Sequence, residues 1–285
     1  MKGAILSAML LLSLVSCQDK ATIEESIDQP KGALFIIGGG KRPAAMIERL
    51  ITESGLREGG YGIILPMSSV EPDSAVFYAK KQFTKAGIDQ VVGFNISADT
   101  VRDSQLDSLG KAAMIYISGG DQNKFMAAIG KSAIYESIHQ AYQQGTVVAG
   151  TSAGAAVMSE VMITGNEKKF PEYQDTFRNI EANNIEMADG LGLVKTAIID
   201  QHFIKRSRYN RLLSAVAEYP QLLGVGIDEA TAILVKGDSA EVVGDSQVIV
   251  MNNQSDQPSE LNGKLGMKNL SVKVLLAGEK FSLVK

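Results

Sequence analysis

Short apolar runs alternate with amphipathic stretches through the first two thirds of the chain. The first run, residues 33–37, is Ala-Leu-Phe-Ile-Ile and is followed by three glycines, as expected of a buried parallel strand that turns sharply at its carboxyl end. Similar runs occupy residues 62–66, 91–96, 113–118 and 146–150. The stretches between them, such as 75–86 and 132–144, have helical spacing. Strands that alternate with helices predict a doubly wound sheet with its ligand site beyond the strand carboxyl ends.

The pattern changes after Pro220. Short β-branched runs, separated by Gly, Asp or Asn, follow one another at residues 224–228, 232–236, 240–243 and 247–251. This spacing predicts hairpins, and residues 272–276 and 281–284 are expected to complete the antiparallel part. The predicted fold class is therefore α/β, with a doubly wound, mostly parallel sheet flanked by helices and with C-terminal β-hairpins.

The first 16 residues differ in character from the rest of the chain. Lys2 supplies a positive start, residues 4–15 form an apolar stretch too short to span a bilayer comfortably, and Cys17 follows directly after Ser16. This pattern resembles a bacterial lipoprotein signal, which implies cleavage before Cys17 and attachment of a lipid to its sulfur. The alternative is an ordinary secretory signal that happens to be followed by a cysteine.

The lipoprotein interpretation sets the expected domain organisation. Residues 1–16 are expected to be the signal peptide, residues 17–30 a polar tether, and residues 31–285 one globular domain. The protein is then expected in the cell envelope, either periplasmic or on the cell surface, and held to the membrane through its lipid anchor only. Because Cys17 is the only cysteine, the domain has neither a disulfide nor a thiol nucleophile.

Composition excludes several classes of function. The formal net charge is −4 and the cationic residues are scattered along the chain, so nucleic acid is not expected as a partner. The two histidines, His139 and His202, are far apart in the sequence, and Cys17 is committed to the lipid, so no cluster of metal ligands is present. We therefore expect neither a metal nor a cofactor.

Residues 150–154, Gly-Thr-Ser-Ala-Gly, fit the G-x-S-x-G pattern of a nucleophile elbow. They follow an apolar run and precede residues 155–162, which are expected to form a helix. Small residues on both sides allow a strained strand-to-helix turn to present Ser152, while nearby backbone amides face a developing oxyanion. A glycine-rich turn with an N-capping serine is the alternative interpretation of such a motif.

A serine nucleophile needs a base, and the chain offers two histidines. His139 lies inside a helical stretch, where a surface or core-edge histidine is the usual explanation. His202 follows the apolar run 196–199 at the carboxyl end of a predicted strand, on the rim where Ser152 is also expected. His202 is therefore the expected base, with a histidine that merely caps a strand end as the alternative.

Three motifs occur in order along the chain. They are Gly-Thr-Ser-Ala-Gly-Ala at 150–155, Asp-Gln-His-Phe at 200–203 with three arginines just downstream, and Gly-Ile-Asp-Glu at 226–229 followed by Thr-Ala. Together they resemble the cyanophycinases, in the serine peptidase family that also contains aspartyl dipeptidase, from about residue 31 to about residue 243. Cyanophycin is a polyaspartate backbone with arginine joined to each side-chain carboxylate, and the resemblance implies an exopeptidase that releases β-aspartyl-arginine from it.

The resemblance implies a Ser-His-Glu triad. Ser152 attacks an aspartyl main-chain carbonyl, His202 moves the serine proton to the leaving amine, and Glu229 orients His202. Glu167 lies where relatives also carry an acidic residue and is the alternative acid. The expected oxyanion donors are backbone amides at two strand ends: Gly119, Gly120 and Ala153. The two glycines could equally form only a turn that leads into a helix.

The resemblance also implies a set of residues that hold the β-aspartyl-arginine unit: Gln122, Asp200, Gln201, Arg206, Arg208 and Arg211. Guanidinium forks bind carboxylates bidentately, so the three arginines are expected to meet the acidic substrate and Asp200 to pair with its guanidinium. The alternative for the arginines is the solvated start of a helix over 209–219. The polar segment 167–190 is expected to border the groove, and relatives suggest a homodimer.

Three other functions fit parts of the pattern. The first is a peptidase with the same machinery that acts on short aspartyl or β-aspartyl peptides, and the retained arginine set argues against it. The second is a surface module that binds acidic ligands without catalysis. The third is an α/β-hydrolase esterase, whose chain order is Ser, acid, His. Here the expected order is Ser, His, Glu, and the distinction disappears if Glu167 is the acid.

Overall fold

The computed structural model describes residues 29–255 and 257–285. The expected signal peptide, the lipidation site at Cys17 and all of the tether except its last two residues lie outside the described residues. None of the described helices is long and apolar enough to cross a bilayer.

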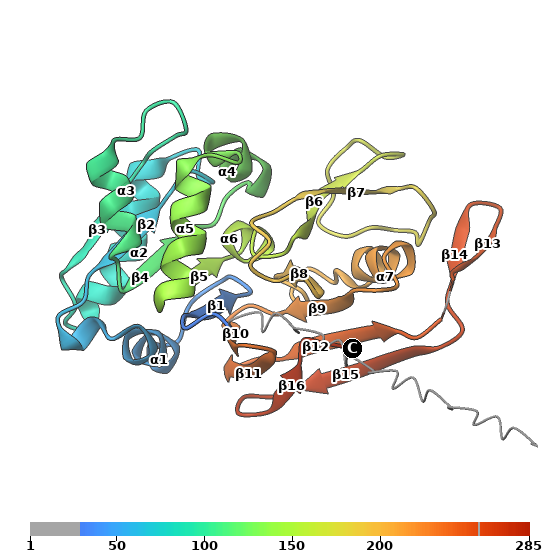
Figure 1. The fold of residues 1–285 in the computed structure, drawn as a ribbon. Coiled ribbons are helices and arrows are strands. Elements are labelled where there is room, and N and C mark those ends of the chain that lie inside the picture. The colour runs from blue at the N-terminus through green and yellow to red at the C-terminus, as the bar shows by residue number, and fades with distance from the viewer. Residues whose placement is uncertain (1–28, 256) are drawn as a thin grey trace, which may run out of the picture.

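An eight-stranded sheet forms the centre of the fold (Figure 1), with the order β16-β11-β10-β1-β5-β4-β2-β3. The parallel strands are β1 (Ala33–Ile37), β2 (Gly62–Leu65), β3 (Val91–Gly93), β4 (Met114–Ile117) and β5 (Val147–Thr151). The antiparallel strands at one edge are β10 (Thr231–Lys236), β11 (Ser239–Gly244) and β16 (Lys280–Ser282). The predicted α/β class with a mostly parallel sheet is confirmed.

Helices cover both faces of this sheet. One face carries α1 (Ala44–Ser54) and α2 (Pro72–Lys85), with the short helix η1 (Leu56–Glu58) between them. The other face carries α3 (Asp103–Gly110), α4 (Gln122–Ile129) and α5 (Ala133–Gln144). The helices pack because their apolar positions recur every three or four residues. Leu50 of α1 and Phe83 of α2 are fully buried against Phe35 of β1 in one core, and each contributes about 1.5–3 kcal/mol.

A second, four-stranded sheet lies beside the first, with the order β15-β12-β9-β8. Its strands are β8 (Ala197–Gln201), β9 (Leu223–Ile227), β12 (Val248–Asn253) and β15 (Leu270–Leu275). The helix α7 (Tyr209–Glu218) connects β8 to β9, which are parallel. The sequence suggested successive hairpins here, and β10 and β11 form one. β9 and β10 do not, because residues 228–230 carry the chain from one sheet to the other.

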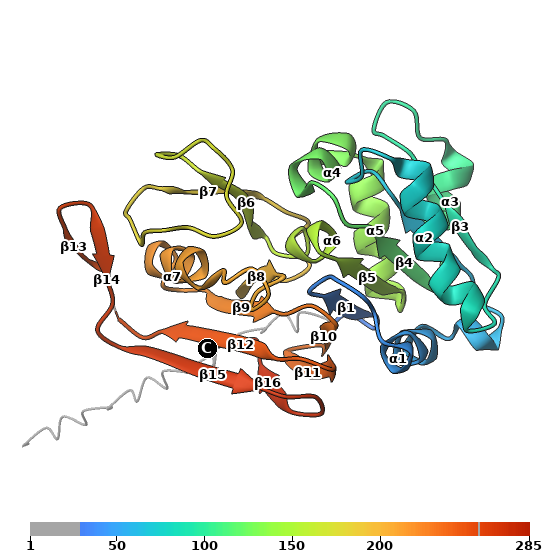
Figure 2. The same cartoon turned by 180° about the vertical axis from the view of Figure 1, so that it is seen from behind.

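The expected helix over 155–162 is wrong. The helix α6 (Ala153–Ala156) is a single turn, and the chain soon enters β6 (Val161–Glu167), which pairs with β7 (Ile185–Asp189). The β-branched residues Val161, Ile163 and Thr164 favour a strand, and the N–H of Glu160 donates to a carbonyl outside the helix, that of Val194. A small hairpin, β13 (Ser259–Leu261) and β14 (Lys264–Gly266), projects from the far end of the molecule (Figure 2).

Candidate active site

Ser152 lies in a sharp turn between β5 and α6. Its φ and ψ are 55° and −113°, a conformation that an L-residue adopts only under strain, of the order of 1–3 kcal/mol. The N–H of Ser152 donates to the carbonyl of Ile37 over 3.0 Å, which ties the turn to the end of β1. A Cβ at position 150 would lie 2.1 Å from the carbonyl oxygen of Gly154, so the glycine at 150 is what lets the turn close. This is the strand-turn-helix setting of a nucleophile elbow.

His202 follows β8 directly, and its ring faces the serine. The Nε2 atom lies 2.8 Å from Ser152 Oγ. The N–H of His202 donates to Gly38 O over 2.8 Å, which connects β8 to the end of β1. A Cβ at position 39 would lie 2.3 Å from His202 Cε1. The glycine run after β1 therefore provides the space that the imidazole occupies, a role that the sequence pattern alone did not reveal.

Glu229 lies in the link between the two sheets, two residues after β9. Its Oε1 accepts a hydrogen bond from His202 Nδ1 over 2.7 Å, and its side chain is 31% exposed. This bond places the imidazole proton on Nδ1, which leaves Nε2 free to accept the proton of Ser152. Glu167, the alternative acid, instead accepts a hydrogen bond from Asn184 Nδ2 over 2.7 Å.

Burial lowers the pKa of His202 below its ordinary value, and the positive charges of Arg206 and Arg208 lower it further. The hydrogen bond and charge of Glu229 act in the opposite direction, because they favour the imidazolium. The net direction is downward, so His202 is neutral at neutral pH. A neutral imidazole beside Ser152 is the state that a general base requires.

Gly119 and Gly120 follow β4 on the same rim. A Cβ at position 119 would lie 3.3 Å from the Cβ of Ser152, so this backbone runs beside the serine. The two glycines also lead into α4, whose N-cap Asp121 accepts hydrogen bonds from the backbone N–H groups of the first turn. Ala153 is the first residue of α6, so its N–H has no acceptor within that helix. Backbone amides from two elements thus border Ser152.

Four of the six predicted substrate residues form a buried network: Asp200, Gln201, Arg208 and Arg211. Arg211 binds Asp200 through two N–H groups, with Nε to Oδ2 at 2.8 Å, and Arg208 donates to the carbonyl of Gln201 over 2.8 Å and to its side chain. The side chains of Asp200, Arg208 and Arg211 are at most 3% exposed. Burial lowers the pKa of Arg208 to about 10, so it remains charged. From the sequence, Arg208 and Arg211 are expected to meet the acidic substrate and Asp200 to pair with its guanidinium. In the structure these side chains are instead bonded to one another and to Gln201.

The remaining two members of the set lie at the margin of this network. Arg206 is partly exposed and makes a single ion pair of 3.3 Å with the exposed Asp175. Gln122 is buried, and its amide donates to the carbonyls of Ile163 and Thr164, at 2.9 and 2.6 Å, on β6. Gln122 therefore connects α4 to the β6–β7 arm, and Arg206 is the arginine of the set that solvent reaches.

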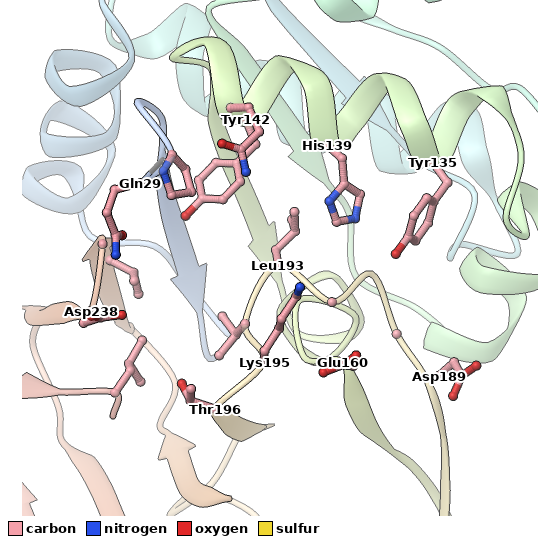
Figure 3. Close-up of a pocket in the computed structure, with 18 of the residues that line it drawn as sticks. Gln29, Tyr135, His139, Tyr142, Glu160, Asp189, Leu193, Lys195, Thr196 and Asp238 are labelled. Atoms are coloured by element: carbon pink, nitrogen blue, oxygen red, sulfur yellow. The ribbon is translucent and has the colours of Figure 1, made fainter. Parts of the chain in front are cut away.

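A cavity of about 600 Å³ lies elsewhere, lined by residues of α5 and of the segment before β8 (Figure 3). Its wall includes His139, whose Nε2 lies 2.7 Å from Leu191 O and whose ring packs on that of Tyr135 with centroids 4.5 Å apart. His139 is therefore held in place by Leu191 and Tyr135 and does not contact Ser152. Within residues 29–255 and 257–285, no group of three His, Cys, Asp or Glu side chains is arranged to hold a metal ion.

Comparison with known proteins relates the chain to one family of peptidases. The family model described as Peptidase family S51 matches residues 34–243. The cyanophycinase of a Nostoc species is 33% identical over 270 residues, which cover 89% of this chain and 86% of the relative. That of Synechococcus elongatus is 30% identical over 266 residues, or 89% and 80% of the two chains. The crystal structure of a peptidase from an acI-B1 actinobacterium has a TM-score of 0.63 at 21% identity, covering 90% of this chain and 98% of its own, and shares the fold.

Proposed function

The chain belongs to peptidase family S51 and is a serine-type peptidase, and we propose that it is an exopeptidase that hydrolyses cyanophycin to β-aspartyl-arginine. The observation that carries the proposal is the hydrogen-bonded chain from Ser152 Oγ to His202 Nε2 at 2.8 Å and from His202 Nδ1 to Glu229 Oε1 at 2.7 Å. The proposed substrate is supported by two relatives named cyanophycinase that align along 89% of this chain.

In the first half of the proposed reaction, Ser152 Oγ forms a bond to the carbonyl carbon of an aspartyl residue in the main chain. His202 Nε2 takes the hydroxyl proton as the bond forms, and Glu229 stabilises the resulting imidazolium. Backbone N–H groups of Gly119, Gly120 and Ala153 stabilise the negative oxygen of the tetrahedral intermediate. The C–N bond then breaks, and His202 gives its proton to the departing amine.

In the second half, water attacks the acyl-serine ester. His202 takes a proton from the water, the carbonyl oxygen again becomes negative between the same backbone amides, and collapse releases the carboxylate and returns the proton to Ser152 Oγ. The lowered pKa of His202 suits both halves, because the imidazole must be neutral at the start of each one.

Charge supports a substrate of the cyanophycin type. Each unit of that polymer carries one carboxylate and one guanidinium, both from its arginine. In our proposal Arg206, which is partly exposed, contacts the carboxylate of the cleaved unit. The contact of Arg206 rests on a rigid base of four residues whose charges and amides are already paired with one another: Asp200, Gln201, Arg208 and Arg211.

We also propose that the protein acts from the cell envelope, held there by a lipid on Cys17. The support is the sequence at residues 1–17, an apolar stretch that starts with a positive charge and ends at the single cysteine. An enzyme in that place meets polymer from outside the cytoplasm.

The full chain and its Ser152→Ala variant, incubated with insoluble cyanophycin, provide the test. Release of β-aspartyl-arginine is measured by mass spectrometry. We expect release by the parent and none by the variant. Labelling by a serine-directed phosphonate is measured in parallel. If the parent is labelled at Ser152 but releases nothing, the protein is still a serine peptidase but cyanophycin is not its substrate. Short aspartyl peptides are then tested as substrates. A parent that is not labelled contradicts the proposed nucleophile.

A further inference from the structure

A groove between α1 and α2 adjoins the pocket beside Ser152. The pocket has a volume of about 280 Å³, and its wall includes Ser152 and His202. The neighbouring cavity, which we call the α1–α2 groove, has a volume of about 810 Å³. Gly40, Arg42 and Tyr78 line both spaces. The two spaces therefore adjoin each other, and the groove lies next to the place where a chain bound at Ser152 would be.

The α1–α2 groove carries an excess of unpaired positive charge. Four cationic residues line it: Lys41, Arg42, Lys81 and Lys85. Across the described part of the chain, none of the four makes an ion pair. Of the two acids in the wall, Glu48 is paired at 2.7 Å with Arg57, which leaves Asp245. Four cations against one unpaired carboxylate favour an anionic ligand.

Unsatisfied polar atoms gather at the same two spaces. Among the described residues, four buried side-chain atoms lack a hydrogen-bond partner, and three belong to residues that line the pocket or the groove. They are Gln82 Nε2, Tyr116 OH and Thr151 Oγ1. Such atoms are rare in folded proteins because each costs about 1–3 kcal/mol. These polar groups therefore lie at the walls of the pocket and the groove and give both spaces a polar lining.

Arg42 is fixed where the pocket meets the groove. Its Nε donates to Gln82 Oε1 over 3.0 Å and its Nη1 donates to Gly40 O over 2.7 Å. These bonds use two of the five N–H donors of the guanidinium and set its orientation. The remaining donors are available to a carboxylate, and little side-chain entropy is lost on binding because the group is already held in place.

We propose that the α1–α2 groove is a second substrate subsite, which binds the carboxylate of a unit next to the one being cleaved, with Arg42 as its principal contact. The inference rests on the proposed function, since the polymer presents one arginine carboxylate in every unit. Lys81 and Lys85 on α2 extend the positive wall for further units. Recognition is thus divided between Arg206, in the segment after β8, and Arg42, in the segment before α1.

The test uses the full chain and two synthetic substrates. One is a single β-aspartyl-arginine unit whose main-chain carboxyl carries an anilide in place of the next unit, and the other is an oligomer of six units. We expect Arg42→Gln to lower kcat/KM on the six-unit oligomer about 10- to 100-fold, mainly through KM, because a charge-assisted bidentate contact is lost. The loss on the one-unit anilide, which has no neighbouring unit, should be at least tenfold smaller. The matched control is Lys195→Gln, which removes an exposed cation from the cavity of Figure 3 and should change neither value.

Binding of the same two substrates is measured in the Ser152→Ala background by fluorescence anisotropy, which needs no turnover. An Arg42→Gln effect on kcat/KM or Kd that is equal for both lengths, or absent, overturns the subsite. If the parent cleaves neither substrate but Arg42→Gln still weakens binding of the longer one selectively, the subsite stands and the proposed reaction fails. Thermal unfolding of each variant shows whether a loss of binding reflects a loss of fold.

Discussion

Replacing Glu229 by Gln tests which carboxylate serves His202. The variant keeps the shape of the side chain and removes its charge, which lies 2.7 Å from His202 Nδ1 in the folded protein. We expect kcat to fall by about two orders of magnitude. The acid limb of the kcat/KM profile should move to lower pH, because the hydrogen bond and charge of Glu229 raise the pKa of His202.

The magnitude follows from Coulomb's law. Two unit charges about 4 Å apart attract by about 4 kcal/mol at an effective dielectric constant of about 20. Because the side chain of Glu229 is 31% exposed, water screens part of this attraction, and about 2–3 kcal/mol remains. That stabilisation applies to the imidazolium of the transition state and corresponds to a rate factor of about 30- to 150-fold.

Glu167→Gln is the matched control. Its carboxylate is bonded to Asn184 and not to His202, so the variant should retain both the rate and the pH profile. Steady-state kinetics on a cyanophycin oligomer between pH 4 and pH 9 measure both quantities. A pH limb that moves in Glu167→Gln and stays in place in Glu229→Gln would refute the assignment, whatever the size of the rate losses.

Two further predictions concern charge and stability. Arg206→Gln removes a positive charge that lowers the pKa of His202, so this pKa should rise. It is measured as the pH at which a small phosphonate labels Ser152 at half its maximal rate. An unchanged midpoint contradicts the coupling between Arg206 and His202. Arg211→Met leaves the buried Asp200 without its bidentate partner, and we expect a loss of about 3 kcal/mol in urea unfolding at an unchanged m-value. Lys111→Met, at an exposed ion pair, should leave the urea midpoint almost unchanged, and similar losses in both variants would refute the role of burial.

Much of the fold was predictable because buried parallel strands are continuous apolar runs. Residues 33–37 correspond to β1 without error. The runs at 62–66 and 113–118 locate β2 and β4 to within one residue at each end. One of the failures depended on long-range pairing. The runs that became β9 and β10 look like the two arms of a hairpin, and local spacing cannot reveal that their partners lie in different sheets.

The candidate site was predictable where chemistry limits the choice. The elbow motif and the scarcity of histidines identify Ser152 and His202 from the sequence alone, and the structure brings them together. The arginines were harder, because a sequence gives the charge of Arg208 and Arg211 but not their burial against Asp200. Arg42 carries no motif, and only the cavity that it lines draws attention to it.

The proposed triad spans the boundary between two sheets. Ser152 ends a strand of the eight-stranded sheet, whereas His202 follows a strand of the four-stranded one, and the bond from His202 N–H to Gly38 O joins the two ends. A displacement of about 1 Å between reacting groups is enough to reduce catalysis about 100-fold. Peptidase activity therefore reports how well the two sheets are docked. A shift of one sheet relative to the other can abolish activity while every strand stays paired. Activity is therefore lost more easily than the fold.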